Sequence, residues 1–163
     1  MTVWQKRTPE VAYLLNPAFC ATVLYVAIRE YQERAFCGFP FPLIYLVLPI
    51  VLHKDTRERI NSRSNMISWL QNNPDVLVNF ALRARDLVVF TNEALEFLLS
   101  QEAIAFDNSS IMISNEIQKA RLSRYKKKDP EISDCLIKSE HVARWFVNMR
   151  VEENIYAAWG VKP

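Results

Sequence analysis

The stretch Thr91-NEALEFLLSQEAIAFDNSSIM-Ile113 decides the predicted fold of this chain. Its first part, up to Leu99, repeats apolar residues at helical spacing and predicts an amphipathic helix. Two β-prone runs follow, residues 104–106 and 111–113, and the polar residues Asp107–Ser110 separate them. We therefore expect a helix followed by a two-stranded hairpin with a four-residue polar turn, in which Asn108–Ser110 are exposed at the tip, and this is the arrangement of a winged helix.

The rest of the chain predicts further helices. Asn16-Pro17 is a start signal for a helix that runs to about Ala35. The segment Leu43–Leu52 is apolar on every face, so it is expected to be central or to be covered by a partner. Only two glycines are present, which disfavours a sheet-rich fold with many tight turns. The predicted fold class is mainly α: one compact, winged-helix-like helical domain with a small β-hairpin, spanning residues 1–163.

Length and composition are those of one globular domain. Half of the 163 residues are apolar and the formal net charge is only +2, so any binding to DNA or anionic lipid has to come from a local patch. Cys20, Cys37 and Cys135 are odd in number and widely spaced, which is typical of reduced thiols. The sequence has neither a signal-peptide layout nor an apolar run of ~20 residues. We expect a cytoplasmic protein that does not enter a membrane.

The sequence offers no recognisable set of catalytic residues. Two isolated glycines cannot build a phosphate-binding loop, and His53 and His141 have no Cys, His or Asp at metal-site spacing. Three acids on one predicted helix, Glu131, Asp134 and Glu140, are typical of a solvated face. We therefore expect a protein that is not an enzyme, has no cofactor or metal, and acts by holding other macromolecules.

A basic segment is the clearest charged feature. Within residues 119–128, six cations gather around Tyr125 with no acid among them: Lys119, Arg121, Arg124, Lys126, Lys127 and Lys128. Such a cluster is either a loop that contacts DNA phosphates or an ordinary solvated loop. A second basic group, between His53 and Arg63, follows the apolar segment. Its cations either cap a helix C-terminus or meet phosphates.

Several stretches of this chain resemble one known family. The most specific is Leu48-Pro-Ile-Val-Leu-His-Lys54, and the others lie, in order along most of the chain, in residues 10–20, 41–47, 56–57, 69–74, 91–99 and 155–163. On these residues the chain resembles the middle component of bacterial three-component ABC-type ATPase defence systems, which are relatives of Lamassu.

The resemblance implies a small accessory subunit without catalytic activity. In that family the subunit stands between a coiled-coil ATPase similar to structural-maintenance-of-chromosomes (SMC) proteins and a toxic effector, and the complex acts against phage or plasmid DNA. The first hypothesis is therefore a subunit that bridges the SMC-like ATPase and the effector of the same operon, with DNA contacted only through the assembled complex. The alternative is a free-standing winged-helix DNA-binding transcriptional regulator whose basic segments meet phosphates.

Partner binding and core packing compete for the same residues in this sequence. Interface energy concentrates in a few buried aromatic and arginine side chains. On that basis the candidate partner-binding residues are Arg57, Trp145, Tyr156 and Trp159. Core packing is the competing role for each, because large aromatic side chains are highly buried on average. The candidate DNA-binding residues are the six cations of the basic segment.

Overall fold

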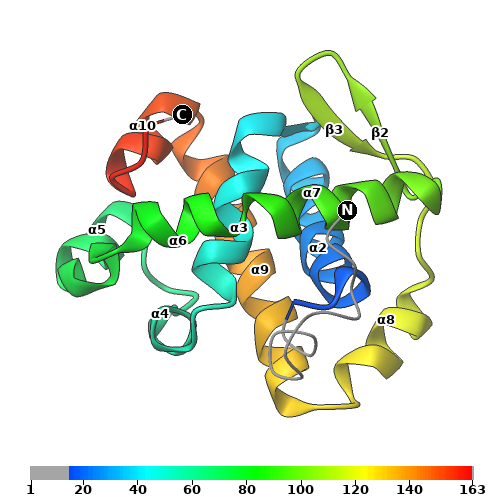
Figure 1. Ribbon diagram of the computed structural model, residues 1–163, viewed down its shortest axis with the longest axis horizontal. Coiled ribbons are helices and arrows are strands. Elements are labelled where there is room, and N and C mark those ends of the chain that lie inside the picture. The colour runs from blue at the N-terminus through cyan, green and yellow to red at the C-terminus, as the bar shows by residue number, and fades with distance from the viewer. Residues whose placement is uncertain (1–14, 163) are drawn as a thin grey trace.

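The computed structural model describes residues 15–162, and Figure 1 shows its helices and strands. These residues are mostly helical, which confirms the expected mainly α fold. The α-helices are α2 (Pro17–Ala35), α3 (Ile44–Val51), α4 (Lys54–Arg59), α5 (Met66–Asn72), α6 (Phe80–Asp86), α7 (Val88–Ser100), α8 (Lys119–Lys126), α9 (Pro130–Met149) and α10 (Glu152–Ala158). The 3-10 helices are η2 (Phe41–Leu43) and η3 (Pro74–Leu77), and the strands are β1 (Phe39–Pro40), β2 (Ile104–Asp107) and β3 (Ser110–Ile113).

Helix α2 lies at the centre of the fold and packs mainly against α9 and α7. It begins where the sequence predicts, because Asn16 Oδ1 accepts a hydrogen bond from the Ala18 backbone N–H at 2.8 Å and Pro17 occupies the first turn. On the α9 side, the Ser139 hydroxyl donates to the Val23 carbonyl at 2.7 Å. This hydrogen bond satisfies a buried hydroxyl inside the apolar contact between the two helices.

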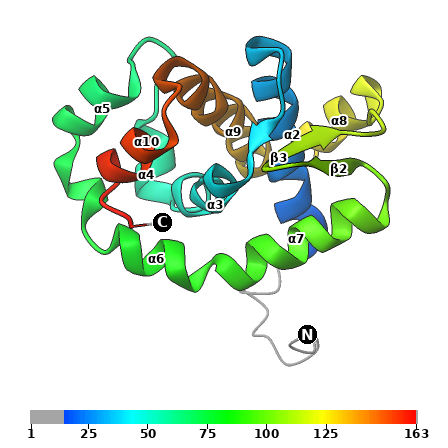
Figure 2. The same cartoon turned by 90° about the horizontal axis from the view of Figure 1, so that it is seen from above.

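The apolar segment Leu43–Leu52 forms α3 and its flanking residues, and it is central. From Ile44 to Val51 every residue except Tyr45 is buried, because α3 packs against α2, α6, α7 and α9 (Figures 1 and 2). The first of the two expected alternatives is therefore correct, since the domain itself covers this segment. The segment supplies little spare apolar surface for a partner.

The predicted hairpin is present as β2 and β3, which pair antiparallel. Its turn is shorter than expected: Asp107 pairs with Ser110, which leaves the two residues Asn108 and Ser109 in place of a four-residue turn. Asn108 has φ 55°, a left-handed conformation that two-residue hairpin turns require and that asparagine tolerates. Asn108 and Ser109 are exposed as predicted, whereas Ser110 is half-buried because it belongs to β3.

A third strand, β1, lies outside what the sequence predicts. It pairs with β3, so the order of the antiparallel sheet is β1-β3-β2. Gly38 precedes this strand at a place where the backbone passes close to β3. A Cβ at Gly38 would lie 2.5 Å from Ser110 Oγ and 2.7 Å from Met112 Sδ, so this close approach requires glycine.

The elements gather toward two ends of the molecule. Helices α5 and α10 lie at one end, the hairpin and α8 lie at the other, and α6 and α7 run along one side between them (Figures 1 and 2). Among the described residues, no helix has both the length and the apolar character that crossing a bilayer demands.

Candidate interaction surface

Arg57, one of the predicted partner anchors, lies inside the domain with 3% of its surface exposed. Its Nε is 2.9 Å from Asp134 Oδ2, and its Nη2 is 3.1 Å from Glu131 Oε1. Nη1 donates to the Val51 carbonyl at 3.0 Å. Burial lowers the pKa of Arg57, but neighbouring negative groups that include the two carboxylates outweigh burial and raise it. The charged guanidinium therefore ties α3 and α4 to α9 and is not available to a partner.

Trp159, a second predicted anchor, is 1% exposed and belongs to an aromatic cluster. Its ring centroid lies 4.7 Å from that of Phe80 and 6.1 Å from that of Trp69. The indole N–H points to Met66 Sδ at 3.3 Å. Side chains from α5 and α6 therefore meet around the tryptophan that follows α10, and Trp159 packs the core.

The other two predicted anchors are buried as well. The ring centroid of Trp145 is 5.1 Å from that of Trp69, and its indole N–H donates to the Ser64 carbonyl at 2.8 Å. The Tyr156 hydroxyl donates to the Pro42 carbonyl, and burial raises the pKa of Tyr156 to about 12. All four predicted anchors are buried in this domain, where each packs against or hydrogen-bonds to neighbouring elements.

The basic segment is the helix α8, where the sequence suggested a loop. Leu122 is buried and Tyr125 is half-buried, so two apolar side chains three residues apart hold one side of the helix against the body. Lys126 Nζ pairs with Glu140 Oε1 of α9 at 3.3 Å. The spacing of Leu122 and Tyr125 was the available signal for a helix, although six cations in ten residues obscured it.

Helical geometry divides the remaining cations of the basic segment into two sets. Arg121 and Arg124 are three residues apart in α8 and share one side of it, and together with Lys128, which follows the helix, they line a hollow with α7. Lys119 and Lys127 are exposed and lie off that side. The first set borders a hollow of the molecule.

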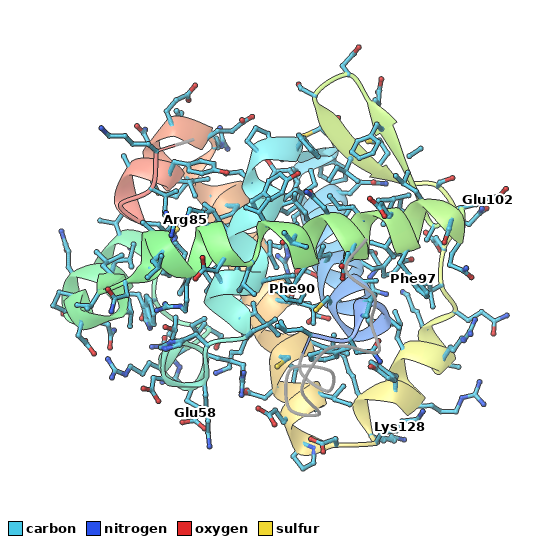
Figure 3. All side chains as sticks on the ribbon, viewed as in Figure 1. Glu58, Arg85, Phe90, Phe97, Glu102 and Lys128 are labelled. Carbon is cyan, nitrogen blue, oxygen red and sulfur yellow. The ribbon has the colours of Figure 1, made fainter. Side chains whose placement is uncertain are left out.

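That hollow, which we name the α7–α8 groove, has a volume of about 900 Å³. Its walls come from α2, α7, α8 and residues 115–118, and the buried side chains of Leu98 and Leu122 contribute to its floor. Phe97 of α7 also lines the groove and keeps 39% of its surface exposed. Figure 3 shows Phe97 on α7 and Lys128 after the end of α8. The groove therefore joins an apolar floor to a basic edge.

A second hollow, of about 620 Å³, lies near the other end of the molecule between α3, α6 and α10. Leu82, Val88 and Tyr45 are among its lining residues, and Arg85, labelled in Figure 3, stands with them. The Tyr45 hydroxyl donates to Asn92 Oδ1 at 2.8 Å, which satisfies that polar group within the domain. This hollow is mainly apolar, and Arg85 and Lys162 are the charged residues among its described lining.

The histidines and one buried cysteine favour their neutral forms. His53 Nδ1 lies 2.8 Å from Thr56 Oγ1, and burial lowers the pKa of both His53 and His141. Burial raises the pKa of the Cys135 thiol to about 11. Such environments are typical of structural side chains, because a reactive cysteine requires a thiolate at neutral pH.

The chain belongs to the Middle Component 3 family of ABC-three component (ABC-3C) systems, because a model of that family matches residues 4–163. This match confirms the resemblance to a middle component that the sequence motifs indicated. No curated protein and no solved structure matches the chain. The family description makes the chain one component of a larger system.

Proposed function

We propose that this chain is a non-catalytic accessory subunit that bridges the SMC-like ATPase and the effector of its system, in a Lamassu-related cytoplasmic defence against phage or plasmid DNA. The family supports this proposal, since its description names a middle component. The α7–α8 groove is the observation that carries it. An exposed apolar hollow beside cations suits a protein partner better than it suits bulk water.

The state of the acidic and nucleophilic side chains supports a role without catalysis. Glu131 and Asp134 both bind Arg57, so these two carboxylates have a structural partner. The Cys135 thiol, with a pKa of about 11, is a poor nucleophile at neutral pH. The purified chain is expected to hydrolyse neither ATP nor DNA, and turnover by nuclease-free protein would contradict this part of the proposal.

The free-standing regulator is the second candidate, and the order of the elements favours it. A helix (α2), a strand (β1), further helices and then α7 with the hairpin follow one another as in a winged helix, in which α7 would be the recognition helix. However, Val88–Ser100 contains Glu93 and Glu96 but neither lysine nor arginine, and Ile104–Ile113 contains Asp107 and no cation. Because DNA phosphates attract cations, this charge distribution argues against α7 and the hairpin entering DNA.

DNA contact is therefore proposed only for the outer side of α8, and only in the assembled complex. Lys119 and Lys127 are exposed there. The second basic group adds little to a phosphate site, because Arg57 is buried and Arg59 pairs with Asp75 at 2.7 Å. Contact through a few exposed lysines would be weak, sensitive to salt and indifferent to base sequence.

Co-expression with the ATPase and the effector encoded beside the gene tests the proposed function. The tagged chain is expected to retain the ATPase through affinity and size-exclusion steps, and its deletion is expected to abolish defence by the system. The regulator becomes the better explanation if the chain alone is a stable DNA-binding homodimer that retains neither component.

A further inference from the structure

Two arginines at the α7–α8 groove have no ion-pair partner among residues 15–162. Several other arginines are paired; for example, Arg144 Nε lies 2.7 Å from Glu30 Oε1. Arg121 and Arg124 are exposed and line the groove. Within residues 15–162, neither of these two side chains forms an ion pair or a hydrogen bond. Their charges are therefore available to a carboxylate or phosphate from outside.

A third cation extends the basic edge along the groove. Lys128 Nζ lies 5.6 Å from the centre of the Tyr125 ring, a cation–π contact that holds the ammonium beside the groove. Glu116, on the loop before α8, is the single acid among the described lining residues. Since three cations face one carboxylate, the lining as a whole favours a negatively charged ligand.

The apolar floor of the groove favours an acidic protein over DNA as the negatively charged ligand. Leu98 and Leu122 form part of it, and Phe97 remains partly exposed beside them. Another protein can place an apolar side chain there and gain burial. A DNA duplex presents mainly phosphates at its outer surface, so it would neutralise the cations and leave this apolar floor unfilled.

We propose that the α7–α8 groove binds an acidic amphipathic segment of another protein component of the same system. Apolar side chains of that segment lie on the floor, and its Asp or Glu carboxylates bind Arg121, Arg124 and Lys128. Arginine suits this role because its planar guanidinium donates two parallel hydrogen bonds to one carboxylate. The inference rests on the proposed function, because it takes the partner from the assembled complex.

Matched charge reversals test the electrostatic half of this proposal. The groove variant combines Arg121→Glu with Arg124→Glu, and the control variant combines Lys119→Glu with Lys127→Glu, which makes the same change in net charge in the same basic segment. The dissociation constant is measured between the purified chain and each other component of the system, at low and at physiological salt. The groove variant is expected to weaken binding by about tenfold or more, and the control by about threefold or less. Equal losses in both variants would overturn the proposal, because they indicate diffuse attraction.

A second pair of variants tests the apolar half. Phe97→Ser removes the exposed ring of the groove, and Val89→Ser is its control, since Val89 is also exposed on α7 but lies outside the groove. Only the Phe97 variant is expected to weaken binding, with both proteins keeping the wild-type melting temperature. Equal binding by the two variants at unchanged stability would show that the floor is not occupied.

A photo-crosslinking amino acid in place of Gln101, an exposed lining residue, identifies the occupant in the reconstituted complex with DNA present. A crosslinked partner peptide that mixes acidic and apolar residues supports the proposal. Crosslinks to DNA, to a second copy of this chain or to a peptide without acids overturn it. If the wild-type chain binds no other component, the proposed function itself fails; if groove variants bind like the wild type, only this inference fails.

Discussion

Replacing Trp159 with alanine removes a ring from the centre of the aromatic cluster between α5, α6 and α10. The indole is 1% exposed. A buried tryptophan removes roughly 200 Å² from water, which at ~25 cal/mol per Å² corresponds to about 5 kcal/mol, and the alanine methyl retains about 1 kcal/mol of this. We therefore expect Trp159→Ala to lower the free energy of unfolding by about 4 kcal/mol, within the range for buried aromatic residues. With a urea m-value of about 2 kcal/mol/M, the unfolding midpoint followed by circular dichroism falls by about 2 M.

The matched control is Phe36→Ala, because Phe36 is an aromatic residue with 91% of its surface exposed. Its ring has little contact to lose, so the free energy of unfolding is expected to change by less than about 0.5 kcal/mol. The reasoning is refuted if Trp159→Ala keeps the wild-type midpoint and loses only the binding to the ATPase. That result would make the ring an interface anchor and not a core residue.

Three further predictions use single sites. Phe36 ends α2 at φ 57°, so Phe36→Gly is expected to raise the free energy of unfolding by about 1 kcal/mol, and a lower urea midpoint would contradict this. Burial raises the pKa of Glu30, but hydrogen bonds from Arg144 and Arg34 outweigh burial and bring the pKa below its ordinary value of 4.5. The ionised Glu30 therefore stabilises the folded state above the unfolded pKa, and this contribution is lost as the pH falls through the folded pKa. Glu30→Gln is therefore expected to be less stable at pH 7 and to flatten the fall in urea midpoint between about pH 5 and pH 3, whereas an unchanged slope would exclude the pairing as its cause. Cys37 is exposed, while Cys20 and Cys135 are buried. Mass spectrometry is therefore expected to show one maleimide on the native chain and three on the unfolded chain. Labelling of a second thiol in the native chain would contradict the burial of Cys20 and Cys135.

Local chemistry explains which parts of the fold the sequence could predict. The start of α2 at Asn16-Pro17 and the hairpin in residues 104–113 each depend on neighbouring residues, and both were predicted. Strand β1 depends on β3, which lies about seventy residues further along the chain and brings Phe39 and Pro40 into the sheet. Proline usually counts against a strand, and two residues are too few to show a period. Such a strand becomes visible only when the tertiary fold is known.

The candidate site was harder to predict because cores and interfaces select the same residue types. Trp145 and Trp159 qualify for either role by composition. What decides between the roles is that α5, α9 and α10 converge, so that Trp69 meets both rings. The prediction for Arg57 failed for another reason: arginine is rarely buried unless it is paired, and the sequence does not show the pairing. Here the carboxylates that pair with it come from α9, more than seventy residues away in the chain.

Because Trp145 and Trp159 are buried, binding energy at the described surface would have to come from other residues. Interface hot spots favour aromatic and arginine side chains in partly desolvated hollows, whereas an isolated surface arginine contributes little. Phe97 comes from α7, and Arg121 and Arg124 come from α8, yet all three line one groove. Only the tertiary fold brings α2, α7 and α8 together around this groove, so the sequence alone could not predict it. A partner that binds outside the groove would depend on scattered surface residues for its affinity. Charge reversal of Arg121 and Arg124 would then leave the complex intact.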